Sequence, residues 1–352
     1  MRPTITDVAQ HAGVSVRTVS RVLNNHPNVS RFTRERVLQA MEELDYGPNA
    51  LARGLATQES YTIGVIIPDV ANPYFAEVVR GVEDTSAEAN YHIFLCNTDE
   101  EPKREIRSIQ LLRQRQVDGL ILVSPRFSDA VATKLFANDR RVVAVNRAWS
   151  NLGITSVIVD NYRKGREAAD ILAATKPDCL AYLSGPMDSE SNELRWAGFS
   201  ERASELQLKT MKIDSSMYRI PAIDRGHEAM DQLLSTTPGV VGVFCFNDLM
   251  AIGALDAVRE HGLSVPRDVR LVGFDDIEMA ARVYPPLTTF HTPKLEIGSI
   301  AMNCLLEILK QDDDVISKEV IISPKAAIRD STRCETRSVP SAVLPTGHST
   351  RR

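Results

Sequence analysis

Residues 8–24 read VAQHAGVSVRTVSRVLN, and this stretch decides how the start of the chain folds. Gly13 supplies a tight turn between two short helices, because glycine accepts backbone conformations that other residues avoid. Thr6 is predicted to cap the first helix and Ser15 the second, and Asp7 suits the electropositive first turn. The pattern is that of a helix-turn-helix.

The second helix of this pair has an apolar face and a polar face. Val19, Val22 and Leu23 are spaced i, i+3, i+4 and therefore face inward. Two outward guanidiniums near the start of an exposed helix suit the major groove of DNA, where arginine reads guanine O6 and N7. A small helical core with solvated arginines is the alternative that periodicity alone leaves open. The outward residues are Val16, Arg17, Ser20, Arg21 and Asn24.

A third helix is predicted from Ser30 to Tyr46, with Ser30 as its cap. Val37, Met41 and Leu44 form an apolar stripe that closes a three-helix unit. The exposed side of this helix carries candidates for phosphate contacts, namely Arg31, Arg34 and Arg36.

Residues 46–56 read YGPNALARGLA and predict one more helix, of about two turns, capped by Asn49. A helix this short is marginal by itself, and Gly54 weakens it by roughly 1 kcal/mol. We therefore expect it to fold only when a partner holds it.

Residues 4–56 resemble the headpiece and hinge of the lactose-repressor (LacI/GalR) family of bacterial transcription regulators. The motifs are DVA at 7–9, AGVS at 12–15, TVSRVLN at 18–24 and YGPN at 46–49. The resemblance implies that Val16, Arg17 and Arg21 read bases and that Leu55 is a wedge in the minor groove, where an apolar wedge kinks DNA. An ordinary linker residue is the alternative for Leu55. The full DNA-contacting set that we infer is Thr4, Ser15, Val16, Arg17, Thr18, Ser20, Arg21, Asn24, Ser30, Thr33, Asn49, Ala52 and Leu55.

From Thr62 onward the chain alternates apolar strands with amphipathic helices, which is typical of parallel sheets covered on both faces. The predicted strands are Thr62–Pro68, His92–Thr98, Gly119–Pro125, Val142–Arg147, Ser156–Asn161, Cys179–Gly185, Thr210–Ser215, Val240–Asn247, Val269–Asp275 and Glu319–Ser323. The predicted helices are Tyr74–Asn90, Pro102–Gln116, Asp129–Asn138, Ser191–Glu205, Ala222–Ser235, Leu249–His261 and Lys294–Lys310. The fold class is an N-terminal all-α helix-turn-helix headpiece plus an α/β body of two doubly wound parallel-sheet lobes.

We expect four regions along the chain. Residues 1–56 form a DNA-binding head with a hinge helix at 49–56, residues 57–61 a linker, residues 62–332 an effector-binding body, and residues 333–352 a disordered tail. The tail is rich in Ser, Pro, Thr and Arg and lacks leucine heptads. Since it cannot form the coiled coil by which some family members become tetramers, a homodimer is expected.

Charge and composition further restrict the classes of function that fit this chain. The chain carries a net charge of −5, yet residues 1–56 hold seven arginines and five acids, so the positive charge is local to the head. No segment has the apolar length of a bilayer span and no signal-peptide core begins the chain, so a cytoplasmic, nucleoid-associated protein without a membrane partner is expected. The cysteines lack metal or redox spacing and are expected to be reduced: Cys96, Cys179, Cys245, Cys304 and Cys334.

The body also resembles the family and is similar to periplasmic sugar-binding proteins, with two lobes around a cleft. Ligands in such sheets bind at the carboxyl ends of strands, where polar residues of this chain gather. Carboxylates, amides and arginine suit sugar hydroxyls, and an aromatic ring suits the apolar face of a sugar. The candidate effector residues are Asn72, Tyr74, Phe75, Asn146, Arg147, Ser189, Ser191, Arg195, Asn247 and Asp275.

Some residues near these positions have competing interpretations. Tyr74 and Phe75 also fit helix-start packing, and Asp248 fits a helix cap better than a ligand. The stretch around Tyr218 departs from the family spacing, so its role stays open. Lys294 suggests an acid or phosphorylated sugar.

Other classes of function are weaker. We find no phosphate-cradling glycine loop, nucleophile-elbow serine or metal-spaced His/Cys set, so neither an enzyme nor a cofactor is expected. A periplasmic solute-binding protein would need an export signal and would not use Arg17, Arg21 or Leu55. The prediction is a dimeric repressor of a near-palindromic duplex DNA operator, controlled by a mono- or disaccharide or a sugar acid. An activator or a corepressor-dependent regulator of the same family is the alternative.

Overall fold

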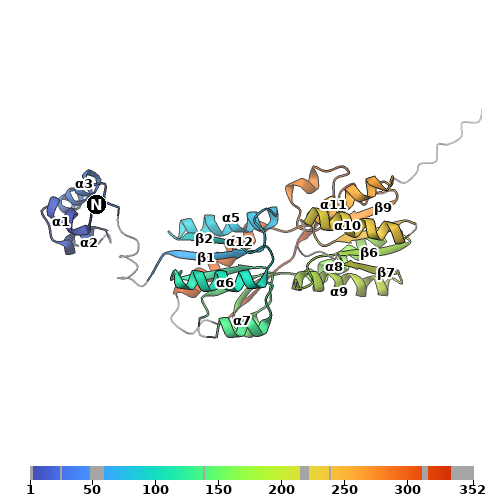
Figure 1. Cartoon of the computed structure of the whole chain (residues 1–352), viewed down its shortest axis with the longest axis horizontal. Helices are drawn as coiled ribbons and strands as arrows, with labels where there is room; N and C mark the ends of the chain where they lie inside the picture. Colours follow the sequence, from blue (N-terminus) through green and yellow to red (C-terminus); the bar gives the residue numbers. More distant parts are fainter. Residues whose placement is uncertain are drawn as a thin grey trace, which may run out of the picture. The chain divides into compact units, whose positions relative to one another are not determined.

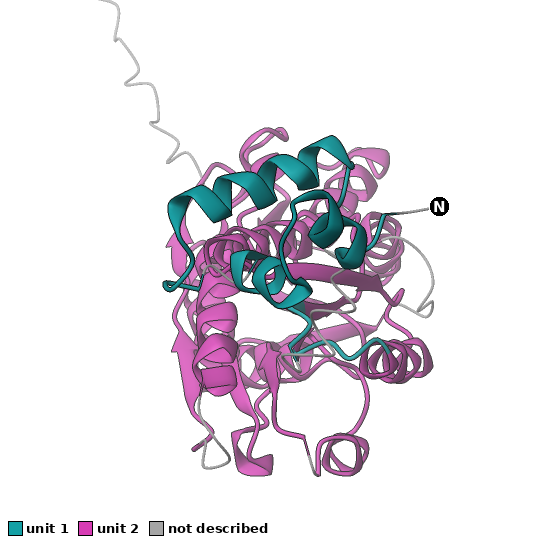
Figure 2. Cartoon of the chain, turned by 90° about the vertical axis from the view of Figure 1, so that its left-hand side faces the viewer, with its two compact units in different colours: residues 1–62, 115–118 teal, residues 63–114, 119–352 magenta. Residues whose placement is uncertain are grey.

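The structure is a computed structural model that describes residues 3–23, 26–47, 59–137, 139–214, 222–237, 239–310 and 316–333. The chain divides into two compact units, residues 1–62 with 115–118 and residues 63–114 with 119–352 (Figure 2). Among the described residues, the smaller unit contains three helices, and the larger contains two α/β lobes.

The smaller unit is built from α1 (Ile5–His11), α2 (Val16–Leu23) and α3 (Arg31–Glu43) (Figure 1). Gly13 takes a left-handed backbone (φ 58°) between α1 and α2, which confirms the predicted helix-turn-helix. The buried core consists of small apolar side chains, namely Val8, Ala9, Ala12, Val19, Val22, Val37 and Ala40.

The predicted cap of the first helix is wrong, because α1 begins after Thr4 and not after Thr6. The backbone N–H of Thr4 donates to Asp7 Oδ2 at 2.7 Å, and Thr4 Oγ1 accepts from the Asp7 N–H at 3.4 Å. These reciprocal bonds form a capping box, which satisfies two backbone donors at once and outcompetes the later start.

The first lobe contains a six-stranded sheet with the strand order β11-β5-β4-β3-β1-β2. Pairs β1–β3, β3–β4, β4–β5 and β5–β11 are parallel, as predicted. Its strands are β1 (Thr62–Ile67), β2 (His92–Asn97), β3 (Gly119–Val123), β4 (Val142–Val145), β5 (Thr155–Val159) and β11 (Glu319–Ile322), with helices α5 (Pro73–Glu88), α6 (Pro102–Gln114), α7 (Asp129–Leu135) and α12 (Lys294–Lys310) and the short 3-10 turn η1 (Ser150–Leu152).

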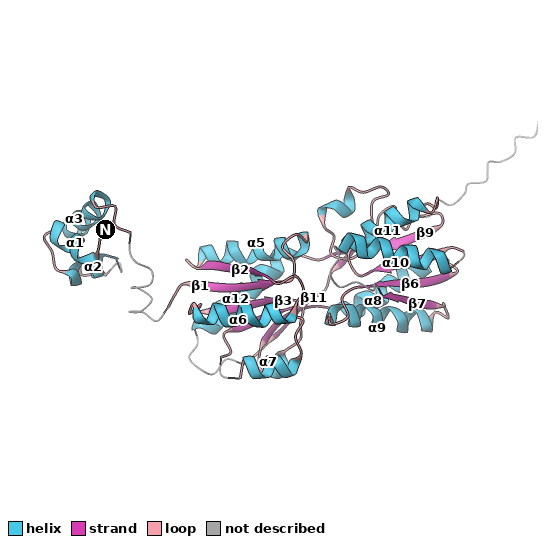
Figure 3. Ribbon diagram, viewed as in Figure 1, coloured by secondary structure: helices cyan, strands magenta, loops and turns pink. Residues whose placement is uncertain are grey.

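The second lobe contains a four-stranded parallel sheet with the order β7-β6-β8-β9. Helices flank the strands of both lobes (Figure 3). The elements are β6 (Cys179–Ser184), β7 (Thr210–Asp214), β8 (Val241–Cys245) and β9 (Val269–Val272), with helices α8 (Asn161–Ala173), α9 (Glu190–Glu205), α10 (Ala222–Thr236) and α11 (Asp248–Glu260) and the 3-10 turn η2 (Glu278–Ala281). The predicted two-lobed α/β body is thereby confirmed.

Within the described residues the chain passes between the lobes three times. β5 leads into α8, and β10 (Thr289–His291) leads back into α12. β11 then leads into β12 (Lys325–Ala327), which pairs antiparallel with β10. Each lobe is therefore assembled from segments that are distant in sequence, and three connections join the two lobes.

The structure differs from the predicted elements in two respects. Helix α8 and strands β10 and β12 were not predicted, and several strands end earlier than expected. Ser124 (φ 51°) and Asn146 (φ 58°) take left-handed backbone conformations directly after β3 and β4. These conformations turn the chain off the sheet, and they place polar side chains at the strand ends.

Gly165 on α8 provides a testable point of close packing. A Cβ at this position would lie less than 3.0 Å from the carbonyl oxygen of Arg195 on α9. Since that neighbour is backbone, Gly165→Ala is expected to destabilise the body by about 2 kcal/mol, measured as a lower urea midpoint. Gly47→Ala is the control, because a Cβ there meets no heavy atom within 4 Å. Equal midpoints for both variants would contradict the packing argument.

Candidate functional site

The outer face of α2 carries the residues predicted to read DNA bases. Val16 is 41% exposed, and Arg17 and Arg21 are exposed, while Val19 and Val22 are buried. Among the described residues, neither arginine is paired with an acidic side chain. The two guanidiniums are thus free to meet an anionic surface.

Polar side chains support the ends of the headpiece helices. Ser15 Oγ accepts from the Thr18 N–H at 3.1 Å, and Ser30 Oγ accepts from the Thr33 N–H at 3.2 Å, as expected of caps. Ser20 is half-buried on α2. These residues hold the helix that presents the arginines.

Two of the arginines of α3 predicted to contact phosphates also donate hydrogen bonds within the headpiece. Arg34 donates to the carbonyl oxygens of Val22 and His26, both at 3.3 Å, and Arg36 donates to the Gly13 carbonyl oxygen at 3.1 Å. Both guanidiniums therefore brace the headpiece. Arg31 is exposed and forms an ion pair with Glu35 at 2.8 Å.

Several predicted residues lie outside the described part of the chain. These are the DNA-contacting candidates Asn24, Asn49, Ala52 and Leu55, together with Tyr218, Cys334 and most of the tail.

A cavity of about 550 Å³, measured with its open mouth, lies in the body between the two lobes. Of the ten predicted effector residues, only Arg147 is absent from its lining. The lining consists of Asp69, Asn72, Tyr74, Phe75, Glu100, Ser124, Arg126, Asn146, Ser189, Ser191, Arg195, Ala222, Arg225, Phe246, Asn247 and Asp275.

Arg147 is engaged outside the cavity. Its Nη2 donates to Asp129 Oδ1 at 2.7 Å, and its Nε lies 3.7 Å from Glu190 Oε2. The guanidinium carbon also lies 5.8 Å from the ring centre of Trp149. The structure thus gives Arg147 a structural ion pair, and its assignment to the effector set is corrected.

The first lobe contributes an aromatic and amide wall. Asn146 Nδ2 donates to Tyr74 Oη at 2.8 Å and to Ser124 Oγ at 3.0 Å. The Asn146 Oδ1 is buried and has no hydrogen-bond partner among the described residues. Asn72 caps α5 by accepting from the Tyr74 N–H at 3.0 Å, and Phe75 packs edge-on against Tyr74. Burial raises the pKa of the Tyr74 hydroxyl, which therefore stays protonated and can donate.

Arg195 of α9 dominates the second-lobe wall. Its guanidinium carbon lies 3.4 Å from the ring centre of Phe274. Its Nε donates to Asn161 Oδ1 at 2.8 Å, and its Nη1 donates to the Phe246 carbonyl oxygen. Burial lowers the pKa of Arg195, and the nearby Asp275 carboxylate opposes that shift. The guanidinium is thus held rigidly at the cavity wall.

Helix starts supply the remaining second-lobe side chains. Ser189 caps α9 and accepts from the Asn192 N–H at 3.3 Å, while Ser191 Oγ accepts from Asn161 Nδ2 at 3.2 Å. Asn247 Oδ1 caps α11 by accepting from the Met250 N–H at 2.9 Å. The amide nitrogen of Asn247 has no acceptor among the described residues, so it remains available to a ligand.

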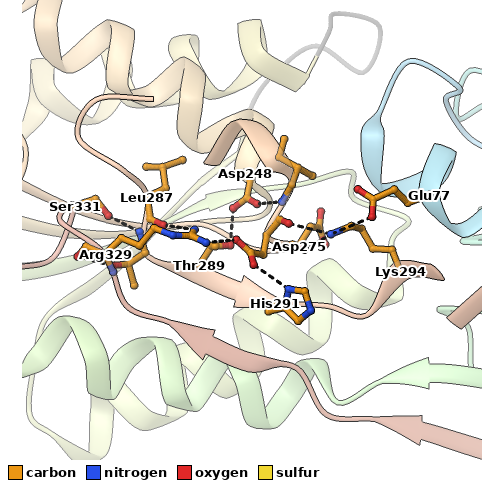
Figure 4. Close-up of polar contacts among 12 residues, drawn as sticks. Glu77, Asp248, Asp275, Leu287, Thr289, His291, Lys294, Arg329 and Ser331 are labelled. Carbon is orange, nitrogen blue, oxygen red and sulfur yellow. Dashed lines mark hydrogen bonds and ion pairs between the residues drawn. The ribbon is translucent and has the colours of Figure 1, made fainter. Parts of the chain in front are cut away.

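Asp275 follows β9 with a left-handed backbone (φ 103°), which aims its carboxyl group at the cavity. Burial raises the pKa of this carboxyl to about 7, and Arg195 and Lys294 limit the rise. The Lys294 ammonium donates to the carbonyl oxygens of Asp275 and Asp276 at 3.0 and 2.9 Å and lies 3.7 Å from Glu77 (Figure 4). Lys294 thus fixes the strained loop and does not line the cavity, which corrects its suggested ligand role.

Asp248 is neither a ligand nor the helix cap, since Asn247 caps α11. It is fully buried and accepts from the Ile277 N–H at 2.9 Å and from Thr289 Oγ1 at 2.6 Å (Figure 4). The side chain therefore joins the start of α11 to β10.

These buried carboxyls predict a pH dependence of stability. Burial raises the pKa of Asp248 from 3.8 to about 8. Because the folded state then holds a proton that the unfolded state has released, stability falls as pH rises from about 4 to about 8. We expect the free energy of urea unfolding to drop by more than about 1 kcal/mol between pH ~6 and pH ~8, and to drop less in Asp248→Asn. Parallel pH profiles for both proteins would refute the assignment.

Four charged residues of the cavity lining are absent from the predicted effector set: Asp69, Glu100, Arg126 and Arg225. Arg126 follows β3 in the same way as the recognised strand-end residues, so its position carried a signal. Arg225 lies on the buried face of α10 beside Gly226 and Ala229, and an arginine on an apolar face was the missed signal there.

Comparisons with known proteins identify the family to which this chain belongs. A family model described as "Bacterial regulatory proteins, lacI family" matches residues 4–49, and one described as "Periplasmic binding protein-like domain" matches residues 169–332. The ribose operon repressor of Halalkalibacterium halodurans is 36% identical over 331 residues, which cover 94% of this chain and 97% of that protein. The chain belongs to the LacI family.

Solved structures of LacI-family regulators support this membership. The lac repressor dimer bound to operator and the anti-inducer ONPF matches with a TM-score of 0.85 and 27% identity, covering 95% of this chain and all of that one. The complex of the transcriptional regulator CelR with cellobiose matches with a TM-score of 0.68 and 28% identity, covering 94% of this chain and all of that one. As a LacI-family member, this chain is a DNA-binding transcription regulator with a ligand-binding body.

Two kinds of feature are absent from the described part of this LacI-family chain. No described helix combines the length and apolarity needed to cross a bilayer. The described residues also contain no cluster of His, Cys, Asp and Glu side chains suited to a metal ion.

Proposed function

We propose that the protein is a homodimeric repressor whose operator affinity changes when a sugar binds between the two lobes of its body. The observation that carries the proposal is the cavity at the carboxyl ends of strands from both lobes, lined by Arg195, Asn146, Asn247 and Asp275. The lac repressor and CelR complexes support it by analogy, since those proteins bind an operator and cellobiose, respectively.

In this proposal the head is residues 1–56 with a hinge helix at 49–56, followed by a linker at 57–61, the effector-binding body at 62–332 and a tail at 333–352. Val16, Arg17 and Arg21 read bases in the major groove, and Leu55 from each protomer meets its partner in the minor groove. A dimer presents two such heads, which requires a near-palindromic operator. The remaining headpiece candidates orient these contacts.

The effector chemistry follows from the cavity wall. Tyr74, Asn146 and Asn247 offer hydroxyl and amide groups, Asp275 accepts hydroxyl hydrogen bonds, and Phe75 offers a face to apolar C–H groups. A polyhydroxylated ligand that spans both walls stabilises one relative arrangement of the lobes. The change in operator affinity then follows from linkage between the two binding equilibria. Such a protein works on cytoplasmic DNA and has no need for catalysis.

Selection of bound duplexes from a random library, with and without a sugar mixture, tests the proposal. We expect a near-palindromic consensus whose recovery changes when sugar is present, and a dimer mass in solution. An absence of any preferred duplex at moderate salt under both conditions would refute it. Tighter DNA binding in the presence of sugar would show that the sugar acts as a corepressor. The protein would then be a corepressor-dependent regulator and not a repressor that its effector releases from DNA.

A further inference from the structure

Two buried arginines face each other across the cavity, one from each lobe. Arg126 follows β3 in the first lobe, and its side chain is 4% exposed; Arg225 lies on α10 of the second lobe and is 9% exposed. The Glu100 carboxylate lies between them, with Oε1 at 3.5 Å from Arg126 Nη2 and Oε2 at 3.3 Å from Arg225 Nη1. Each oxygen of the Glu100 carboxylate thus contacts a different guanidinium.

Both guanidiniums are poorly satisfied for groups so deeply buried. A guanidinium carries five N–H donors. Among the described residues, each of these two donates only to Glu100, and the Nε atoms of Arg126 and Arg225 are buried with no partner. Buried donors without acceptors are costly and rare in native structures. Both guanidiniums can therefore still donate to an acceptor-rich ligand.

The charge of the cavity lining is also slightly positive at neutral pH. Its charged side chains are Arg126, Arg195 and Arg225 with Asp69, Glu100 and Asp275. Burial raises the pKa of Asp275 to about 7, so one of the three negative charges is only partly present. Two further acids, Asp188 and Glu105, lie nearby but do not line the cavity. Burial raises the pKa of both, to about 7 for Glu105, whose carboxylate accepts the Arg126 backbone N–H at 2.9 Å. The negative charge of Glu105 at neutral pH is thereby reduced.

We propose that the effector is a sugar acid, and that its carboxylate is held by Arg126 and Arg225 while its hydroxyls meet the Arg195, Asn146 and Asp275 wall. A carboxylate supplies a negative charge and the planar acceptor pair that guanidinium forks match, and the buried Nε donors of Arg126 and Arg225 have no other acceptor among the described residues. A phosphate monoester carries about −1.5 to −2 at neutral pH and exceeds the small positive excess of the lining by more than a carboxylate does. The inference rests on the proposed effector function and narrows its ligand class.

The acid group also has a mechanical consequence. Because Arg126 and Arg225 belong to different lobes, a carboxylate bound to both adds an ionic link across the cleft. A neutral sugar of the same stereochemistry lacks this link. The acid is therefore expected to be the better effector as well as the tighter ligand.

Calorimetric titration of the full-length dimer with matched ligands tests the inference. The panel contains D-gluconate, D-galactonate, D-glucuronate and D-galacturonate, with D-glucose, D-galactose and their 6-phosphates. At least one acid is expected to bind roughly 10- to 100-fold more tightly than its matched neutral sugar. A panel in which no acid exceeds its neutral partner would overturn the inference, and so would tighter binding of a 6-phosphate.

Three substitutions sharpen the test. Arg225→Gln and Arg126→Gln are each expected to reduce the ratio of acid affinity to neutral-sugar affinity to about one. Glu100→Gln raises the local charge by one, so it is expected to strengthen acid binding, a gain that misfolding cannot imitate. Arg147→Gln is the matched control, because it removes a positive charge outside the cavity lining. Weaker acid binding in Glu100→Gln would contradict the charge argument.

The same samples separate this inference from the proposed function. A neutral sugar that binds best and alters operator affinity would leave the repressor function standing and refute the acid. A sugar acid that binds with the predicted response to the substitutions, yet leaves DNA binding unchanged, would refute the effector function and support the acid site.

Discussion

Replacing Arg195 with alanine is expected to abolish the response to the effector while sparing operator binding. The guanidinium lies against Phe274 and is fixed by Asn161 and the Phe246 carbonyl, so its remaining donors have one orientation toward the cavity. Its loss also removes the cation beside Asp275, whose pKa then rises further. Effector affinity should fall roughly 100-fold or more, as measured by calorimetry.

A second variant distinguishes lost binding from lost folding. Arg195→Met keeps an unbranched side chain in the place of the methylene stem of the arginine, and it removes a buried charge whose desolvation is costly. Its unfolding free energy should therefore stay within about 1.5 kcal/mol of the parent, while the effector response is lost. A methionine variant that still responds normally would exclude Arg195 from the site.

Replacing Leu55 with glycine is expected to remove specific operator binding and leave the body folded. Leu55 lies outside the described residues, so this expectation rests on the family resemblance of residues 46–55. Without the wedge, the central base step stays stacked and the DNA is not kinked, and the hinge helix loses the contact that orders it. Specific affinity should fall roughly 100-fold, whereas binding to random duplex through phosphate contacts remains.

Two neighbouring substitutions separate the wedge from helix propensity. Leu55→Ala keeps a good helix former but removes the wedge, so it should lose nearly as much affinity. Gly54→Ala keeps the wedge and favours the helix by roughly 1 kcal/mol, so operator binding should be equal or tighter. Fluorescence anisotropy on operator and random duplexes measures both, and an unimpaired Leu55→Ala variant would refute the wedge.

Local chemistry made the headpiece largely predictable from sequence. The spacing of Val19 and Val22, the turn at Gly13 and the caps Ser15 and Ser30 all act within a few residues. The error at Thr6 was also local, because Thr4 and Asp7 have the three-residue spacing of a capping box. A stricter use of that spacing would have given the observed helix start.

Periodicity likewise predicted the alternating strands and helices of the body, and the strand-end rule led to most of the cavity wall. Neither rule could predict contacts between side chains that are distant in the sequence. Glu100 meets Arg126 and Arg225, and Arg225 is distant from both in the sequence, so only the folded chain brings the three together. The ligand role suggested for Lys294 was wrong for the same reason. Its ammonium donates to two backbone carbonyls, whose position depends on the path of the loop.

The connectivity of the two lobes affects how this protein folds during translation. Strand β11, which covers the edge of β5, lies at residues 319–322, and β12 follows it at the end of the described body. A nascent chain on the ribosome therefore carries an unpaired, apolar β5 edge until residues 319–322 have been synthesised. A premature stop before residue 319 would leave both lobes incomplete, so we expect such fragments to require chaperones or to be degraded.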